Sequence, residues 1–310
     1  MTAIHIHSTF DAGNIEVLPS KDPLHVRLKI KPDPFTEGTD KRAHFQWFYF
    51  QVTQGKNQPL NFSIENASEA SYNKAWDGYH TAYSYDREKW LRVPGCSYKN
   101  GQLHWHLTPK ENYVWFAYFA PYSYERHLQT LAHISATGET QVSSLGSTLD
   151  GRSIDLVKIG HGPRKVWIVG RQHPGESMAS WFIEGLMHRL MKHGDAAARR
   201  LKELATFRII PNINPDGSVR GHLRTNAAGA NLNREWAPTG SYMAPTLERS
   251  PEVFHVLAEL DKIGCDFYAD IHGDEEIPAN FLAGSEGIPS YSEKQNEDYA
   301  AFQNELLRAS

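Results

Sequence analysis

The hydrophobic and polar residues of this chain follow two different patterns. Up to about Pro121, short segments rich in aromatic and β-branched residues alternate with turn signals, as in HFQWFYFQVTQG, GQLHWHL and YVWFAYFAP. Five of the eight tryptophans precede residue 120, so this part has enough large apolar side chains for a core of its own. The pattern predicts an all-β antiparallel sandwich domain over residues 1–120.

The second pattern predicts an α/β domain over residues 121–310. The run KVWIVG is short and almost continuously apolar, which is typical of a strand buried on both faces. Apolar residues from Met178 to Leu190 follow at spacings of three and four, and they predict an amphipathic helix that stops by Gly194. The arrangement recurs at FRIIPNINPDG and DFYADIHGD, with the helical pattern PEVFHVLAELDKIG before the latter. Loops after the strands of such a sheet carry the ligand chemistry.

Length and composition narrow the classes of protein. The 310 residues exceed the usual size of a single core, which favours two domains. The net charge is −4 without a long Lys/Arg run, so we expect no nucleic-acid partner. The N-terminus lacks the pattern of an export signal and no apolar segment is long enough to span a membrane, so we expect no membrane partner. Only Cys96 and Cys265 are present, which fits the cytoplasm.

The stretch HPGES places His173 and Glu176 three residues apart after the first buried strand. Residues i and i+3 face the same way where the backbone curls, so an imidazole and a carboxylate there can converge on one cation. An alternative is that the glutamate merely suits the positive end of the helix that follows.

His272, in YADIHGDEE, follows another apolar run, ninety-six residues after Glu176. A single histidine at a strand end is more often structural. Two histidines and one glutamate at two strand ends, however, form the ligand set of catalytic zinc sites that leave a fourth position for water. The three residues together predict a zinc site.

Two arginines lie between these ligands, in the loop region before DFYADIHGD. Arg224 and Arg234 could hold a substrate carboxylate and stabilise a developing oxyanion, or they could be ordinary solvated surface residues. The nearby sequence Asn214-Pro215-Asp216-Gly217 has the signature of a type I turn and could serve only to reverse the chain.

In the order HPGES, NPDG, NLNREW and DIHGDE, these motifs resemble those of the M14 metallocarboxypeptidases, specifically the cytosolic carboxypeptidase branch. FDAGNIEVL, QWFYFQV and AYFAPYSYERHL look like the β-sandwich domain of that branch and its junction with the catalytic domain, so the resemblance covers about residues 10–284. It implies a carboxypeptidase domain with a mixed sheet flanked by helices, and a zinc-dependent enzyme that removes the C-terminal residue of peptides or protein tails.

The resemblance also implies a role for each site residue. His173, Glu176 and His272 would hold the zinc, Asn233 and Arg234 would bind the terminal carboxylate of the substrate, and Arg224 would polarise the scissile carbonyl. The general-base glutamate of the family lies on a later strand, whereas this chain ends thirty-eight residues after His272. We therefore expect a chain cut short at its C-terminus.

Two other functions stay open at this point. A zinc amidohydrolase acting on small acylated amino acids would keep the same ligands and carboxylate grip, although the N-terminal sandwich favours the peptidase. A non-catalytic zinc- or peptide-binding module is compatible with a chain that lacks the base. The sequence indicates neither the side-chain preference nor the oligomeric state.

Overall fold

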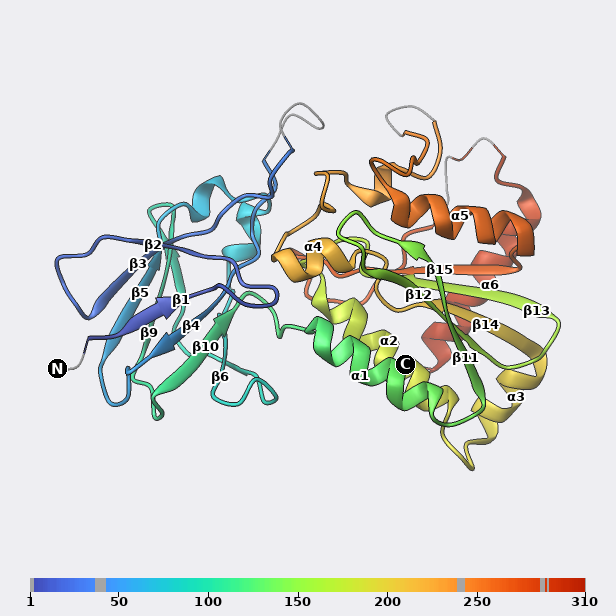
Figure 1. Ribbon diagram of the computed structural model, residues 1–310, viewed down its shortest axis with the longest axis horizontal. Helices are drawn as coiled ribbons and strands as arrows, with labels where there is room; N and C mark the ends of the chain where they lie inside the picture. The colour runs from blue at the N-terminus through green and yellow to red at the C-terminus, as the bar shows by residue number, and fades with distance from the viewer. Residues whose placement is uncertain (1–2, 37–42, 239–242, 285–287, 289, 310) are drawn as a thin grey trace. The chain divides into compact units, whose positions relative to one another are not determined.

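The structure, a computed structural model, describes residues 3–36, 43–238, 243–284, 288 and 290–309 (Figure 1). Residues Met1–Asp274 form one compact unit, and Glu275–Ser310 form a second one. The second unit contains helix α6 (Glu293–Ala309), none of whose residues is buried. Within the described residues, no helix is long and apolar enough to cross a membrane.

The N-terminal part of the first unit is built from two five-stranded sheets. The first has the order β1 (His5–His7), β4 (Tyr49–Thr53), β10 (Tyr113–Ala117), β6 (Ala82–Ser84) and β7 (Leu91–Arg92). The second has the order β2 (Glu16–Leu18), β3 (His25–Lys29), β5 (Leu60–Ile64), β9 (Gln102–Leu107) and β8 (Ser97–Lys99). Two 3₁₀ turns, η1 (Ala67–Glu69) and η2 (Asn73–Trp76), lie in the chain between β5 and β6.

Aromatic side chains from both sheets meet in one core, as expected of a sandwich. Phe62 of β5 lies 4.7 Å from Phe116 of β10 between ring centroids, and it stacks on Trp105 of β9 at 5.0 Å. Phe50 of β4 contacts the same group, at 6.3 Å from Phe62. The predicted β-sandwich is therefore confirmed, with one departure: β3 and β5 pair in parallel, whereas every other pair in these two sheets is antiparallel.

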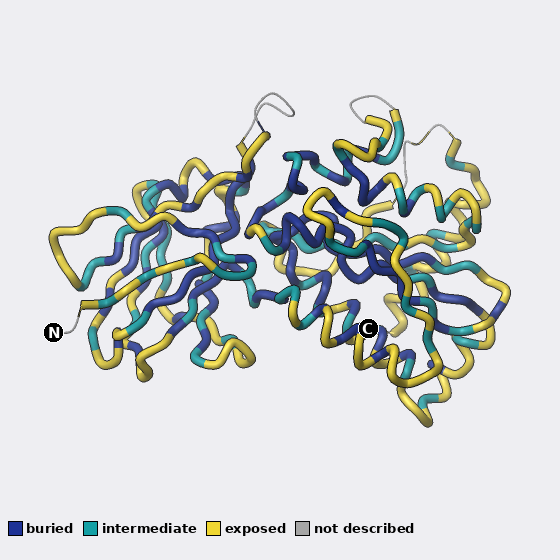
Figure 2. The backbone as a smooth tube through the Cα atoms, viewed as in Figure 1, coloured by how far each residue is buried: buried dark blue, intermediate teal, exposed yellow. Residues whose placement is uncertain are grey.

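A third, mixed sheet carries the site. Its order is β11 (Thr140–Ser147), β12 (Ser153–Ile159), β14 (Ala205–Ile210), β13 (Arg164–Gly170) and β15 (Phe267–Ile271). The strands β14, β13 and β15 are parallel, and β11 and β12 are antiparallel to their neighbours. The apolar run KVWIVG falls in β13 between β14 and β15, and Trp167 and Val169 are fully buried. The tube coloured by burial shows that buried backbone is concentrated in the strands of the sheets (Figure 2). Successive β13 residues face opposite layers, because Ile168 lies in one core and Trp167 and Val169 lie in the other.

Helices cover both faces of this sheet. The helices α1 (Tyr124–Ser135) and α2 (Ser177–Leu190) bury Ile134 and Ile183 against one face, and α5 (Pro251–Ile263) buries Val256 against the other. The remaining elements are α3 (Ala196–Leu204), α4 (Pro215–Arg220) and the 3₁₀ turn η3 (Leu232–Arg234). The predicted mixed α/β sheet flanked by helices is confirmed.

The sequence Asn-Pro-Asp-Gly does more than reverse the chain. It begins α4: Asn214 is the N-cap and accepts the N–H of Gly217, while Pro215 occupies the first helical turn. Asp216 is fully buried and accepts hydrogen bonds from Thr148 and Arg152. The type I turn prediction was therefore incomplete, because a type I turn and the first turn of a helix share their local backbone angles.

Candidate metal centre

The His-Pro-Gly-Glu turn follows directly from β13 and leads into α2. Arg171, the first residue after the strand, adopts a positive φ of 60°, which swings the chain out of the sheet. Its buried guanidinium donates to the carbonyl oxygen of Pro174 at 2.9 Å, and this hydrogen bond stabilises the turn. Burial lowers the pKa of Arg171 to about 10, so the group stays charged at neutral pH.

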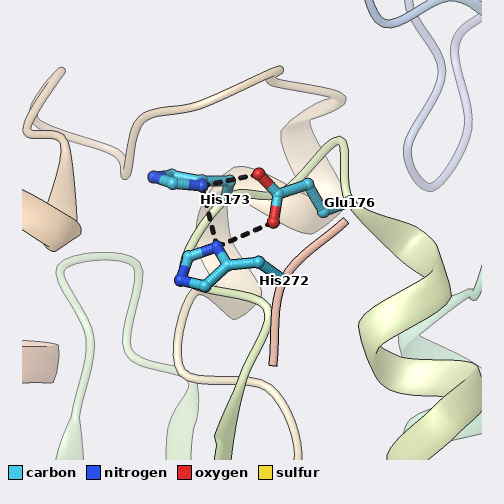
Figure 3. Close-up of side chains that lie close together, drawn as sticks. All are labelled: His173, Glu176 and His272. Carbon is cyan, nitrogen blue, oxygen red and sulfur yellow. Dashed lines mark hydrogen bonds and ion pairs between the residues drawn. The ribbon is translucent and has the colours of Figure 1, made fainter. Parts of the chain in front are cut away.

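His272 reaches the same place from β15, the strand beside β13 (Figure 3). The Nδ1 atom of His173 lies 2.6 Å from Oε1 of Glu176, and Nδ1 of His272 lies 2.8 Å from Oε2 of the same carboxylate. The two Nδ1 atoms are 3.2 Å apart. His173 and Glu176 are buried and His272 is half-buried. The structure thus brings together the three residues predicted as metal ligands.

Glu176 stands at the N-cap of α2, but its side chain does not cap the helix. Its carboxylate instead accepts the backbone N–H of Gly273 at 2.9 Å and faces both histidines. A favourable interaction with the helix dipole alone would leave this side chain free to point elsewhere. The contacts of the carboxylate therefore favour the ligand interpretation over the helix-dipole alternative.

Burial and charge act against each other at these three residues. Burial lowers the pKa of His173, and the positive charge of Arg224 lowers it further, against the opposing pull of Glu176. For Glu176, burial favours the neutral acid, but the two histidines outweigh it and hold the pKa of the carboxyl well below its usual value. Burial also opposes charge on His272, yet hydrogen bonds to Asp270 and Glu176 raise its pKa to about 10.

The three donors lie close enough together to hold one zinc ion. All three ligand atoms lie within 4.8 Å of one another, and within the described part of the chain this is the single group of such residues. Ligands about 2.0–2.2 Å from a tetrahedral zinc are separated from one another by about 3.3 Å. The 3.2 Å between the two histidine nitrogens is close to that value, whereas the 2.6 and 2.8 Å from these nitrogens to the carboxylate oxygens are hydrogen-bond distances. One carboxylate and two imidazoles are also the donor types that zinc prefers.

Further polar residues fix the orientation of the two histidines. Nε2 of His272 lies 2.7 Å from Oδ2 of Asp270, which also accepts a hydrogen bond from Gln172. Gln172 in turn accepts from the indole N–H of Trp236 at 2.9 Å. Nε2 of His173 lies 3.2 Å from Oδ1 of Asn231. Such outer partners select the tautomer and fix the ring plane of a ligating histidine.

The other predicted site residues lie on two segments near this centre. Arg224 is close enough for its charge to lower the pKa of His173, and its Nη1 donates to the hydroxyl of Tyr72 at 2.7 Å. Asn233 and Arg234 belong to η3, two and three residues after Asn231. The guanidinium of Arg234 donates to the carbonyl oxygen of Asn233 at 2.9 Å.

Sequence reasoning missed Asp270, Gln172, Asn231 and Tyr72. A signal existed for Asp270, because residues i and i+2 of a strand lie on the same face and Asp270 stands two positions before His272. The others are linked to the site only through contacts between segments far apart in the chain. Their partners lie 58 to 152 residues away.

Two histidines and a glutamate beyond the strands of a mixed α/β sheet are a ligand set found in catalytic zinc sites of hydrolases. Residues 125–304 match the model of the zinc carboxypeptidase family M14, and residues 6–119 match that of the cytosolic carboxypeptidase N-terminal domain. The chain belongs to the M14 zinc carboxypeptidase family. It is accordingly a metallocarboxypeptidase, a hydrolase of peptide bonds.

Solved structures of relatives agree with this assignment. The metallo-carboxypeptidase from Burkholderia cenocepacia is 43% identical with a TM-score of 0.93, and the match covers 100% of this chain and 80% of that one. The metallo-carboxypeptidase from Pseudomonas aeruginosa is 42% identical with a TM-score of 0.89, over 98% and 79% of the two chains. Cytosolic carboxypeptidase 4 of Mus musculus is 28% identical; the match covers 90% of this chain but only 28% of the mouse protein.

Proposed function

We propose that the chain holds one zinc ion between His173, Glu176 and His272 and removes the C-terminal residue of peptides or protein tails. The observation that carries the metal site is the convergence of three donor atoms within 4.8 Å, from the loops after β13 and β15. When bound, zinc would supply Lewis-acid chemistry for the scissile carbonyl and for water. The family to which the chain belongs supports zinc as the metal.

In this proposal Arg224 stabilises negative charge that develops on the oxygen of the scissile carbonyl. Its influence on the pKa of His173 supports a position near the metal centre. A guanidinium is always charged near neutral pH and needs no proton transfer to act. Preorganised donors of this kind are commonly the largest single contribution to acyl-transfer catalysis.

Asn233 and Arg234 are proposed to bind the terminal carboxylate of the substrate. Both residues belong to the 3₁₀ turn that follows Asn231. The side chain of Asn231 contacts His173, so the position of this turn is fixed relative to the metal centre. The planar guanidinium of Arg234 suits a bidentate grip on a carboxylate. The relative from Pseudomonas aeruginosa was solved in complex with (2-guanidinoethylmercapto)succinic acid, a ligand with two carboxylic acid groups, which is consistent with a carboxylate grip.

The test is hydrolysis of matched peptides by the zinc-loaded protein. Peptides with a free C-terminal carboxylate should lose one residue, and the same peptides with an amidated C-terminus should be poor substrates. Small N-acylated amino acids are tested in parallel. Their hydrolysis in place of peptide hydrolysis would indicate the amidohydrolase alternative. Equal cleavage of free and amidated peptides would contradict the carboxylate role of Asn233 and Arg234.

We also propose residues 1–120 and 121–310 as the two domains, and the cytoplasm as the location. The family-model matches at residues 6–119 and 125–304 support the division. The names of the cytosolic carboxypeptidase relatives and the two free cysteines support the location.

A further inference from the structure

We infer that the N-terminal domain takes part in the active site by positioning Arg224, through the side chains of Asp33 and Tyr72. The inference rests on the proposed role of Arg224 in the reaction. In this view the two β-sandwich residues place a charged group beside the metal centre. Asp33 and Tyr72 would act through Arg224, as positioning residues.

Asp33 binds the backbone on both sides of Arg224. Its carboxylate accepts the N–H groups of Leu223 at 2.7 Å, Arg224 at 2.8 Å and Thr225 at 2.9 Å. It also accepts the hydroxyl of Thr225 at 3.0 Å. Asp33 is only 3% exposed, and hydrogen bonds to a charged group are about twice as strong as neutral ones. Three successive peptide groups are thereby held in one orientation.

Tyr72 holds the other end of the same residue. Its hydroxyl accepts a hydrogen bond from Nη1 of Arg224 at 2.7 Å. The backbone of Tyr72 is itself held by Gln46, whose side chain accepts the N–H of Tyr72 and donates to its carbonyl oxygen, both at 3.0 Å. A long arginine side chain has many rotamers, so a partner whose own backbone is fixed lowers the cost of ordering the guanidinium.

The anchored segment is joined directly to the metal centre. The carbonyl oxygen of Leu223 accepts the N–H of Gly175 at 2.8 Å, inside the His-Pro-Gly-Glu turn. A Cβ atom at Gly175 would lie 3.0 Å from that same oxygen, so the two backbones approach as closely as a glycine allows. Leu223 is therefore held by Asp33 through its N–H and by the metal-ligand turn through its carbonyl.

A purely structural role predicts a different behaviour from a positioning role. If Asp33 and Tyr72 only held the two parts of the chain together, their loss would lower stability whether or not Arg224 is present. If they position Arg224, their effect on binding of a tetrahedral transition-state analogue should disappear once the arginine is removed. A double-mutant cycle with Arg224→Ala separates the two cases.

The experiment uses a peptide in which a phosphinate replaces the scissile amide, because transition-state analogues report on interactions that act during the reaction. Its affinity for the zinc-loaded protein is measured for Tyr72→Phe, Asp33→Asn and Arg224→Ala, and for each of the first two combined with the third. Tyr49→Phe is the matched control, since the hydroxyl of Tyr49 accepts a hydrogen bond from a different arginine of the same domain, Arg87, at 3.1 Å. Thermal unfolding is recorded for every variant.

Tyr72→Phe should bind the phosphinate about tenfold more weakly, the scale of a lost hydrogen bond to a charged group. Tyr49→Phe should bind it like the wild type, and Tyr72→Phe should have no further effect in the Arg224→Ala background. Unchanged affinity in Tyr72→Phe, with a loss in Arg224→Ala, would overturn the inference, as would an equal loss in both backgrounds. If Arg224→Ala itself has no effect, the proposed role of Arg224 fails first, and the inference fails with it.

Discussion

The Nδ1 atoms of His173 and His272 lie 3.2 Å apart, although ninety-nine residues separate them in the chain. Both nitrogens also face the carboxylate of Glu176. Two imidazoles this close cannot both carry a proton on the facing atoms without strong repulsion. A divalent cation, if bound there as proposed above, would take the place of a proton and attract all three donors.

Zinc content should depend on His173 and not on buried histidines in general. We expect about one equivalent of zinc in the purified protein, and its loss in His173→Ala, because two remaining ligands hold zinc weakly. His127→Ala is the matched control, since His127 is also buried against a carboxylate, at 2.8 Å from Asp155. Elemental analysis of both variants checks this. A full equivalent of zinc in His173→Ala would exclude the residue as a ligand.

Asp270 should tune the affinity for zinc through His272. The side chains lie 2.7 Å apart, and loss of an outer carboxylate of this kind typically weakens metal binding by about 10–100-fold. We expect a loss of that size for Asp270→Asn in competition titrations with a chelator. Asp155→Asn removes the corresponding carboxylate beside His127 and should leave zinc affinity unchanged. Identical dissociation constants for the two variants would show that Asp270 does not act on the metal site.

Arg234 should not tolerate replacement by lysine. An ammonium group cannot reproduce two parallel hydrogen bonds to a carboxylate. We therefore expect Arg234→Lys to lower kcat/KM for free-acid peptides by roughly a hundredfold, about 2.7 kcal/mol of lost transition-state stabilisation. Arg220→Lys serves as the control, because Arg220 makes a comparable two-point contact with Asp150. Unaltered kinetics in Arg234→Lys would rule out the bidentate grip.

Glu252 should make the fold less stable as pH rises. This carboxyl is fully buried at the start of α5, and burial raises its pKa to about 7. The negative charges of Asp216 and Asp150 also raise the pKa, and a hydrogen bond from Asn226 opposes them. Between about pH 4.5 and 7 the carboxyl of Glu252 keeps its proton in the folded state and loses it in the unfolded state. The contribution of this group to the free energy of unfolding therefore decreases over that range and is level above it.

Glu252→Gln should remove this slope. We expect the variant to be more stable than the wild type at pH 8, by on the order of 1–3 kcal/mol, and to differ little from it near pH 4. Urea unfolding across this range provides the measurement. Glu259→Gln, on the same helix but partly exposed and paired with Lys262, should keep the wild-type slope. Parallel pH profiles for Glu252→Gln and the wild type would refute the assignment.

Local sequence patterns determined the two kinds of domain and the three predicted ligands. The apolar run 165–170, the spacing of three and four after Met178 and the strand-end His272 are signals within a few residues, and side-chain periods of 2 and 3.6 translate them into strands and a helix. The motifs around His173, Glu176 and His272 predicted a site whose three residues the structure brings together, while their role as zinc ligands stays a prediction.

The tertiary structure alone decided which residues support that site. Asp33 and Leu223 are 190 residues apart, and Asn231 reaches His173 across 58, so no local pattern could pair them. The parallel pairing of β3 with β5 was equally hidden, because a strand shows the same alternation whichever direction its neighbour runs. Propensity and periodicity act between near neighbours in the chain. Hydrogen bonds between distant segments depend on how the elements pack, and only the folded chain specifies that.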